Sequence, residues 1–91
     1  MKVKWTSKGH SDLVRLHEFL AAVNPGAAAN AVRALIAGAS RLPDHPRIGE
    51  KLEQYEPLEV RRVLIGDYEM RYEIRDATIY VLRLWHTREH R

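Results

Sequence analysis

Residues 60–86 read VRRVLIGDYEMRYEIRDATIYVLRLWH, and this stretch decides the fold. In its centre, from Tyr68 to Arg75, apolar and charged residues alternate without a break. A period of two over this length predicts a β-strand with one apolar and one polar face. The apolar set is Tyr68, Met70, Tyr72 and Ile74, and the polar set is Glu69, Arg71, Glu73 and Arg75.

Short turn signals flank this strand on both sides. Gly66-Asp67 and Asp76-Ala77 have the length of hairpin connections. The runs beyond them, 60–65 and 78–85, are rich in Val, Ile, Leu, Tyr and Trp. The second run is apolar on both faces, which indicates a central strand that is covered on both sides. The stretch therefore predicts an antiparallel meander that carries Arg61, Arg62, Arg71, Arg75 and Arg83.

The N-terminal part predicts a short strand over residues 2–5 and then a helix over about 11–23. The helix is expected because apolar residues recur there at spacings of three and four, which is one stripe of an amphipathic helix. The stripe consists of Leu13, Leu16, Leu20 and Val23, with Asp12, Arg15 and Glu18 outside it. The candidate caps at its start are Thr6, Ser7 and Ser11.

A second helix is expected from Asn24-Pro25 to about Leu42. Asn is a good N-cap, and Pro is tolerated at the first helical position because its missing N–H would be unpaired there. Two helices joined this tightly should form an antiparallel hairpin. The apolar stripe of the second helix consists of Ala28, Val32, Leu35, Ala39 and Leu42, with Ile36 beside it.

These elements predict a single α+β domain over residues 1–91, in the order β-α-α-β-β-β. Residues 43–49 form a loop by composition, and residues 50–57 are expected to be a connection into the second strand. The helical hairpin can cover the apolar face of an antiparallel sheet, which is a two-layer arrangement. The opposite face, with its arginines, is then expected to stay open.

The composition sets limits on the class of protein. The chain has 91 residues, 45% of them hydrophobic, which supports a packed core in one domain. It has no cysteine, so a disulfide framework and a thiolate zinc site are excluded, and a reducing cytoplasm is the expected location. No apolar run is long enough for a signal peptide or a membrane span. The net charge of +3 permits an anionic partner without requiring one.

An ordered set of short motifs extends over nearly the whole chain, and through it the sequence resembles the RelE/ParE superfamily of toxins from bacterial type II toxin–antitoxin modules. The details are closer to the ParE-like branch. The motifs are Trp5-Thr6, Asp12-Leu13, Asn24-Pro25 with Ala28, Leu42-Pro43, Pro46-Arg47-Ile48-Gly49, Val60-Arg61-Arg62, Gly66-Asp67-Tyr68 with Tyr72, Ile79 to Val81, Leu84-Trp85-His86 and Arg88.

The resemblance implies two alternative activities on one fold. ParE-like members inhibit DNA gyrase and are not enzymes in their own right, whereas RelE-like members cleave translated mRNA on the ribosome. Both are neutralised by a cognate antitoxin, and neither alternative implies a cofactor, a metal or a membrane. The ParE-like function is the favoured interpretation, and the mRNA interferase is the alternative. A third, weaker hypothesis is a toxin homologue that acts only as an antitoxin-bound regulator.

RNA cleavage by a 2′-hydroxyl requires a base, a cation for the phosphorane and an acid for the leaving oxygen. Arginine suits the cation because its planar fork holds two phosphate oxygens, and histidine titrates near neutrality. By motif position, the candidates for a ribonuclease are Arg61, Arg83 and His86. The candidate binding residues are Arg62, Arg71, Trp85 and Arg88. The lysines on which RelE relies are absent here, because Lys51 is the last lysine of the chain.

A structural interpretation competes with this chemistry. Arg71 and Arg75 alternate with glutamates, so this face is expected to be mainly a lattice of solvated cross-strand ion pairs. From Leu58 to Arg91 there are seven arginines and six acidic residues, and such a near-neutral sheet attracts RNA poorly. For Arg61 and Arg83, function and structure are equally supported.

Two histidine patterns give weaker evidence of function than the arginines do. His86-Thr87-Arg88-Glu89-His90 matches a metalloprotease pattern, but that motif requires a helix and a further downstream ligand. His10 and His17 provide only two ligands and are better explained as a solvated helix surface. Between the helical hairpin and the sheet edge, a groove is expected that an antitoxin helix or strand can fill.

Overall fold

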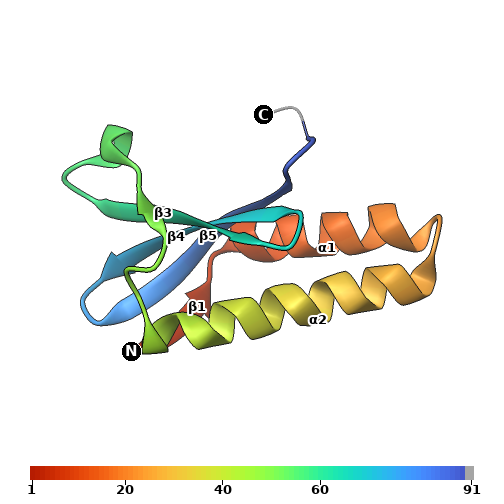
Figure 1. Cartoon of the computed structure of the whole chain (residues 1–91), viewed down its shortest axis with the longest axis horizontal. Helices are drawn as coiled ribbons and strands as arrows, with labels where there is room; N and C mark the ends of the chain where they lie inside the picture. The colour runs from red at the N-terminus through yellow and green to blue at the C-terminus, as the bar shows by residue number, and fades with distance from the viewer. Residues whose placement is uncertain (90–91) are drawn as a thin grey trace.

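The computed structural model describes residues 1–89 and contains two helices packed on a five-stranded sheet (Figure 1). The predicted two-layer α+β class is therefore confirmed. The strands are β1 (Lys2–Trp5), β2 (Glu50–Lys51), β3 (Glu59–Ile65), β4 (Tyr68–Arg75) and β5 (Thr78–His86). The helices are α1 (Ser7–Ala21) and α2 (Pro25–Arg41), and the 3₁₀ turns are η1 (Leu42–Asp44) and η2 (Glu53–Tyr55).

The sheet has the strand order β1-β5-β4-β3-β2. Strands β3, β4 and β5 form the predicted antiparallel meander, with bounds within a residue of those expected. The sheet as a whole is mixed and not purely antiparallel, because β1 pairs with β5 in parallel, Trp5 lying opposite Val81. The parallel pairing was not apparent in the sequence because it joins the two ends of the chain.

The tight turns have the backbone that hairpins require. Gly66 has a φ of 58°, and Asp76 and Ala77 have φ values of 50° and 59°. The second turn has positive φ at both central residues and the first has it at Gly66 alone, and both arrangements match the right-handed twist of the strands that they join.

The helical hairpin begins and ends largely as the caps predict. The Thr6 side chain accepts a hydrogen bond from the Gly9 N–H, so α1 begins four residues earlier than expected. Asn24 caps α2 in the same way by accepting from the Ala27 N–H, with Pro25 in the first helical position. The end of α1 was overestimated, since Val23 lies beyond it and is 88% exposed.

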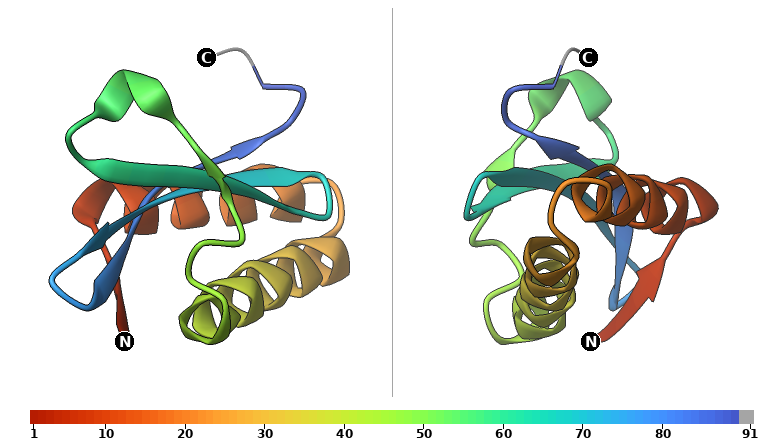
Figure 2. Two further views of the ribbon diagram at one scale, coloured as in Figure 1. Left: turned by 60° about the vertical axis from the view of Figure 1, so that its left-hand side comes forward. Right: turned by 90° about the vertical axis from the view of Figure 1, so that its right-hand side faces the viewer.

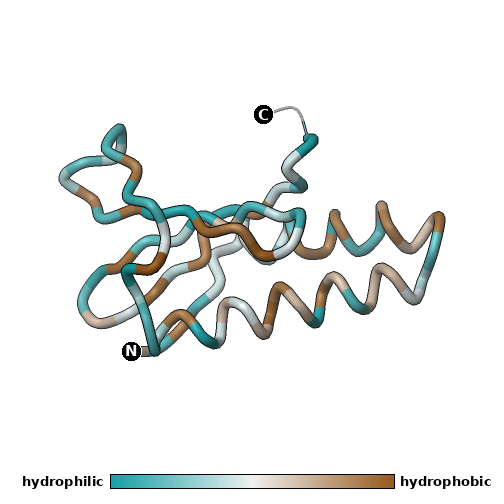
Figure 3. Tube along the Cα trace, viewed as in Figure 1, coloured by the Kyte–Doolittle hydropathy of each residue, from teal (hydrophilic) through white to brown (hydrophobic). Residues whose placement is uncertain are grey.

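The core lies between the hairpin and the predicted apolar face of the sheet. Apolar residues recur along both helices and the inner strands (Figure 3). Met70, Tyr72 and Ile74 of β4 are buried as the alternation predicts, and Tyr68 is partly buried against the same core. The other members of the core are Leu16, Leu35, Ala39, Leu42, Ile79, Val81 and Leu84.

The opposite face of the sheet is covered in part, which corrects the prediction that it stays open. Residues 50–57, expected to be only a connection, contain the edge strand β2 and the turn η2, and η2 lies on the side of the sheet away from α2 (Figures 1 and 2). There Tyr55 contacts Arg71, and Leu52 and Val60 are buried. Glu69 and Glu73 are consequently buried too, at 2% and 8% exposure.

A register shift in β5 alters which of its side chains lie on each face. Arg71 is opposite Arg83 and Tyr72 is opposite Val81, so Leu82 is an extra residue with no partner in β4. A bulge of this kind changes the alternation along the strand. As a result, Val81 and Leu84 are both in the core, although they are three residues apart.

Candidate functional site

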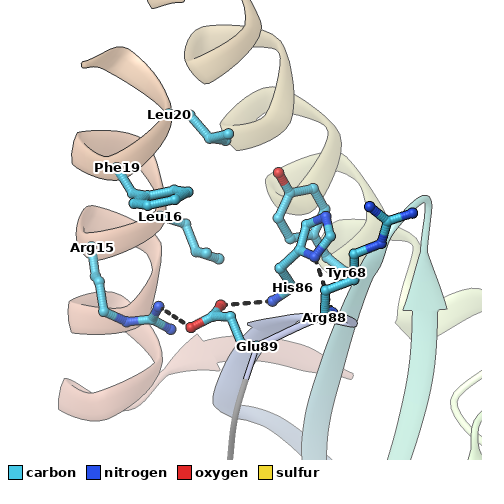
Figure 4. Close-up of a pocket in the computed structure, with 8 residues that line it drawn as sticks. All are labelled: Arg15, Leu16, Phe19, Leu20, Tyr68, His86, Arg88 and Glu89. Carbon is cyan, nitrogen blue, oxygen red and sulfur yellow. Dashed lines mark hydrogen bonds and ion pairs between the residues drawn. The ribbon is translucent and has the colours of Figure 1, made fainter. Parts of the chain in front are cut away.

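An apolar groove of about 500 Å³ lies between α1 and the end of the meander (Figure 4). Its α1 wall is formed by Leu16, Phe19 and Leu20, and Tyr68 and His86 lie opposite. Phe19 is 73% exposed, so the groove has an apolar rim that is open to a partner. The predicted groove beside the hairpin is therefore present. Its remaining lining residues are Arg15, Arg88 and Glu89.

The polar end of this groove is organised by Glu89. Its carboxylate accepts hydrogen bonds from the Arg15 guanidinium and, at 2.8 Å, from the His86 N–H. The His86 ring meets Tyr68 edge to face at 5.3 Å, and its Nδ1 accepts from the Arg88 N–H at 3.1 Å. Burial, together with Asp67 and Glu89, raises the pKa of Tyr68 above its ordinary value. His86 and Arg88 thus help to shape the groove.

Three arginines form a row across the other face of the sheet. Arg62 of β3 lies opposite Arg71 of β4, which lies opposite Arg83 of β5. Directly opposed like charges are unfavourable unless they have partners. Each guanidinium has a carboxylate: Glu50 at 2.6 Å from Arg62, Glu69 at 2.9 Å from Arg71 and Asp12 at 2.7 Å from Arg83.

The prediction of an ion pair is confirmed for Arg71, but its partner Glu69 lies on the same strand and not across the sheet. The pair is also not fully solvated, because Glu69 is buried. Arg75 differs: its guanidinium stacks over the Tyr80 ring at 4.5 Å. Trp85 also stacks, since the guanidinium carbons of Arg71 and Arg83 lie 4.8 and 4.9 Å from its ring centroid. The ring is partly buried and holds these two cations in place.

Asp12 is a buried acid that holds Arg83 on this face, and the sequence placed it outside the buried stripe of α1. It is 6% exposed and accepts from the Leu84 N–H at 2.9 Å as well as from Arg83 Nε. Burial alone would raise the pKa of Asp12, but the hydrogen bonds from Arg83 and Leu84 outweigh it and lower that pKa below 3.8. Burial was missed because the partners of Asp12 are more than 70 residues away.

Arg61 lies on the helix-facing side, opposite Tyr72, and stabilises the loop before β2. Its Nη1 donates to the Gly49 carbonyl at 2.8 Å, and its Nε donates to Glu59 at 2.9 Å. The buried Tyr72 hydroxyl donates to the Pro46 carbonyl and accepts from the Gly49 N–H. The Arg47 hydrogen bond lowers the pKa of Glu59 against the opposing effect of burial, and Arg61 adds to this lowering.

The three candidates for ribonuclease chemistry are therefore distributed over the molecule. Arg83 is on the face of the arginine row, Arg61 is on the opposite face, and His86 lines the apolar groove. The structure does not bring Arg61 and Arg83 together on one face. Their catalytic assignment stays a prediction. Of the candidate binding residues, Arg62, Arg71 and Trp85 share one face, and Arg88 is at the groove.

A second cavity, of about 430 Å³, was not foreseen from the sequence. It lies where the start of α1 meets the arginine row, and Tyr55 of η2 forms part of its wall. Tyr55 and Lys8 carry no motif, and only the fold brings them next to Arg71 and Arg83. The full lining is Thr6, Ser7, Lys8, Tyr55, Arg71, Leu82 and Arg83.

Residues 1–89 provide neither a cluster of metal ligands nor a helix that could span a membrane. No three His, Asp or Glu side chains in this part of the chain are grouped to hold a metal ion. His90 of the metalloprotease-like pattern lies outside the described residues. Neither described helix combines the length and apolarity needed to cross a membrane.

Comparison with known proteins gives the family. A solved structure described as the chromosomal ParDE TA system from P. aeruginosa superposes with a TM-score of 0.79 at 21% identity, covering 94% of this chain and 95% of that one. This similarity shows a shared fold. No curated protein sequence matches the chain significantly. The profile of the ParE toxin of the type II toxin–antitoxin system parDE matches residues 3–91. Because this match covers nearly the whole chain, the protein belongs to the ParE toxin family.

Proposed function

We propose that this toxin inhibits DNA gyrase and is neutralised by a cognate antitoxin that binds the apolar groove. The family match over residues 3–91 is the observation that carries the proposal. Gyrase inhibition is the activity that the resemblance to ParE-like toxins implies, and an antitoxin is the partner it implies.

The groove has the properties that an antitoxin helix requires. An amphipathic helix binds by placing its apolar face in a hydrophobic groove. Leu16, Phe19 and Leu20 supply that groove. Arg88 adds a positive charge beside it, whereas the charge of Arg15 is already paired with Glu89. An antitoxin segment with apolar anchors and acidic flanks is complementary to this surface.

The distribution of arginines favours gyrase inhibition over RNA cleavage. A ribonuclease site needs its cation and its acid or base within reach of one phosphate. Arg61 and Arg83 lie on opposite faces of the sheet, and each is held by a carboxylate within 3 Å. For the gyrase contact we propose the outward side of α1 around Val14 and His17, which is exposed and lies away from the groove.

The test is induction of the chain without antitoxin in growing cells, followed within minutes by two assays on the same culture. Covalent gyrase–DNA complexes are isolated, and RNA 5′ ends are sequenced. The expected result is gyrase–DNA adducts with intact transcripts. New RNA ends within translated codons, with no adducts, would establish the interferase alternative instead.

Two variants on different sides of α1 separate the gyrase contact from the antitoxin contact. Val14→Asp changes the outward side, and Phe19→Glu changes the groove rim; these side chains are 42% and 73% exposed, so the fold should survive both changes. We expect Val14→Asp to reduce gyrase adducts while antitoxin binding persists. We expect Phe19→Glu to weaken antitoxin binding while the adducts persist. The reverse pattern would contradict the assignment of the two surfaces.

A further inference from the structure

The second cavity, beside the start of α1, has a lining that offers hydrogen-bond donors and no acidic side chain. Lys8, Arg71 and Arg83 are its cations, and Ser7 and Tyr55 contribute hydroxyl groups. Such a lining is suited to an anion, because each of these groups can donate to an oxygen acceptor.

The two guanidiniums are oriented so that one nitrogen of each remains available. Arg71 uses Nε for Glu69 and Nη1 for the Tyr55 hydroxyl. Arg83 uses Nε and Nη2 for Asp12. Among residues 1–89, Nη2 of Arg71 and Nη1 of Arg83 have no acceptor. The stacking on Trp85 holds both side chains in these orientations, so little conformational entropy is lost when an anion binds.

Tyr55 and Lys8 complete the set of donors. The Tyr55 oxygen accepts from Arg71 at 2.9 Å, which leaves its own hydrogen to donate. Within the described part of the chain, the Lys8 ammonium and the Ser7 hydroxyl have no hydrogen-bond or ion-pair partner. Five donors thus line one cavity of about 430 Å³, while the carboxylates that hold the arginines lie outside its lining.

We propose that this cavity binds a phosphate group of a nucleic-acid backbone. The number of donors favours phosphate over a carboxylate, which has only two oxygens and is satisfied by a single guanidinium fork. The cavity is open to solvent through exposed Ser7 and Lys8, as a site for a polymer must be. Half-buried Leu82 and Tyr55 supply an apolar surface beside the cations for the sugar or base.

The test measures binding of the full chain to a fluorescein-labelled 12-nucleotide DNA and to the RNA of the same sequence, by anisotropy over a salt series. Lys8→Ala removes one cation, and we expect affinity to fall about five-fold and the slope of log K against log salt to decrease by about one. Tyr55→Phe removes only a hydroxyl and is expected to weaken binding about three-fold with little change in slope. Both side chains are at the surface or half-buried, so neither variant threatens the fold.

The matched control is Lys4→Ala, which removes the same charge from exposed strand β1 outside the cavity. Equal losses for Lys4→Ala and Lys8→Ala would mean that only net charge matters, and would overturn the site. The proposal would also be overturned if inorganic phosphate bound to the chain but neither oligonucleotide did. The same holds if only an acidic peptide competed for the site. A preference between DNA and RNA identifies the polymer. The assay contains no gyrase and no antitoxin, so its failure leaves the proposed function standing.

Discussion

Strands β5 and β3 each have an edge that lacks a neighbouring strand over part of its length, and the backbone groups of the two edges are covered differently. Strand β5 loses its neighbour β1 beyond Val81, and strand β3 loses its neighbour β2 beyond Arg62. Along β5, side chains of α1 replace the missing strand. Along residues 63–65 of β3, the described structure places no strand on the outer side, and Leu64 is 64% exposed.

Along β5, hydrogen bonds between the backbone and the side chains of Thr6, Asp12 and Arg15 take the place of those that a neighbouring strand would make. Thr6 donates to the carbonyl of Val81 at 3.0 Å, Asp12 accepts from the N–H of Leu84 at 2.9 Å, and Arg15 donates to the carbonyl of Leu84 at 3.1 Å. Backbone groups at an edge must be paired or solvated, and a helix laid along the edge also prevents strand addition there. One edge is therefore closed by contacts between distant parts of the sequence, and the other is open.

Asp12→Ala is the variant expected to have the largest effect on the closed edge of β5. The change leaves the Leu84 N–H and the Arg83 guanidinium without their buried acceptor, so we expect a loss of about 3–4 kcal/mol in the free energy of unfolding. Asp12→Asn keeps one acceptor oxygen and should lose about half of that. Urea denaturation measures both. A loss below about 1 kcal/mol for the alanine variant would show that the edge does not depend on this carboxylate.

Gly9→Ala tests how closely α1 must approach β5. A Cβ at Gly9 would lie 2.4 Å from the Val81 carbonyl oxygen, which is backbone and has little room to move. We expect destabilisation of about 1–3 kcal/mol, in spite of the better helix propensity of alanine. The control is Gly26→Ala in α2, where the nearest atom is 3.4 Å away and the effect should be neutral or slightly stabilising. Equal thermal stability of the two variants would contradict the close approach.

The pH dependence of stability should carry the signature of Asp12. Its pKa is lowered in the folded state, so the native chain releases this proton more readily than the unfolded chain does. The stabilisation from Asp12 is therefore complete above its ordinary value of 3.8 and is lost as the pH falls through the folded pKa. Urea midpoints measured from pH 6 down to pH 2 should fall less steeply for Asp12→Asn than for the unsubstituted chain. If the urea midpoints of the two proteins fell equally with pH, Asp12 would not contribute to the acid sensitivity.

The smallest expected effect is at the open edge. Leu64→Lys places a charge on β3 where the chain is exposed, so the free energy of unfolding should change by no more than about 0.5 kcal/mol. A charge at an edge discourages pairing with another chain, so any concentration-dependent association seen by light scattering should decrease. A loss comparable to that of Asp12→Ala would show that this edge is also closed.

Much of the fold was predictable because its elements are set by local periodicity. The alternation from Tyr68 to Arg75 gave β4 its bounds, and Asn24-Pro25 gave the start of α2. The groove followed from the expected hairpin. The grouping of the candidate site residues did not follow, because it depends on how the strands pair. The bulge at Leu82 places Arg83 opposite Arg71, on the face away from Arg61.

The sequence by itself determined the four longer strands, the two helices, the two-layer class and the motifs of the toxin family, since each depends on residues close together in the chain. Only the tertiary structure decided that β1 pairs in parallel with β5, that Asp12 is buried, and that Lys8 and Tyr55 share a cavity with Arg71 and Arg83. These features depend on contacts between residues 16 to 76 positions apart, from Tyr55 with Arg71 to Trp5 with Val81. Such contacts depend on packing and strand register, so a local pattern in the sequence does not predict them.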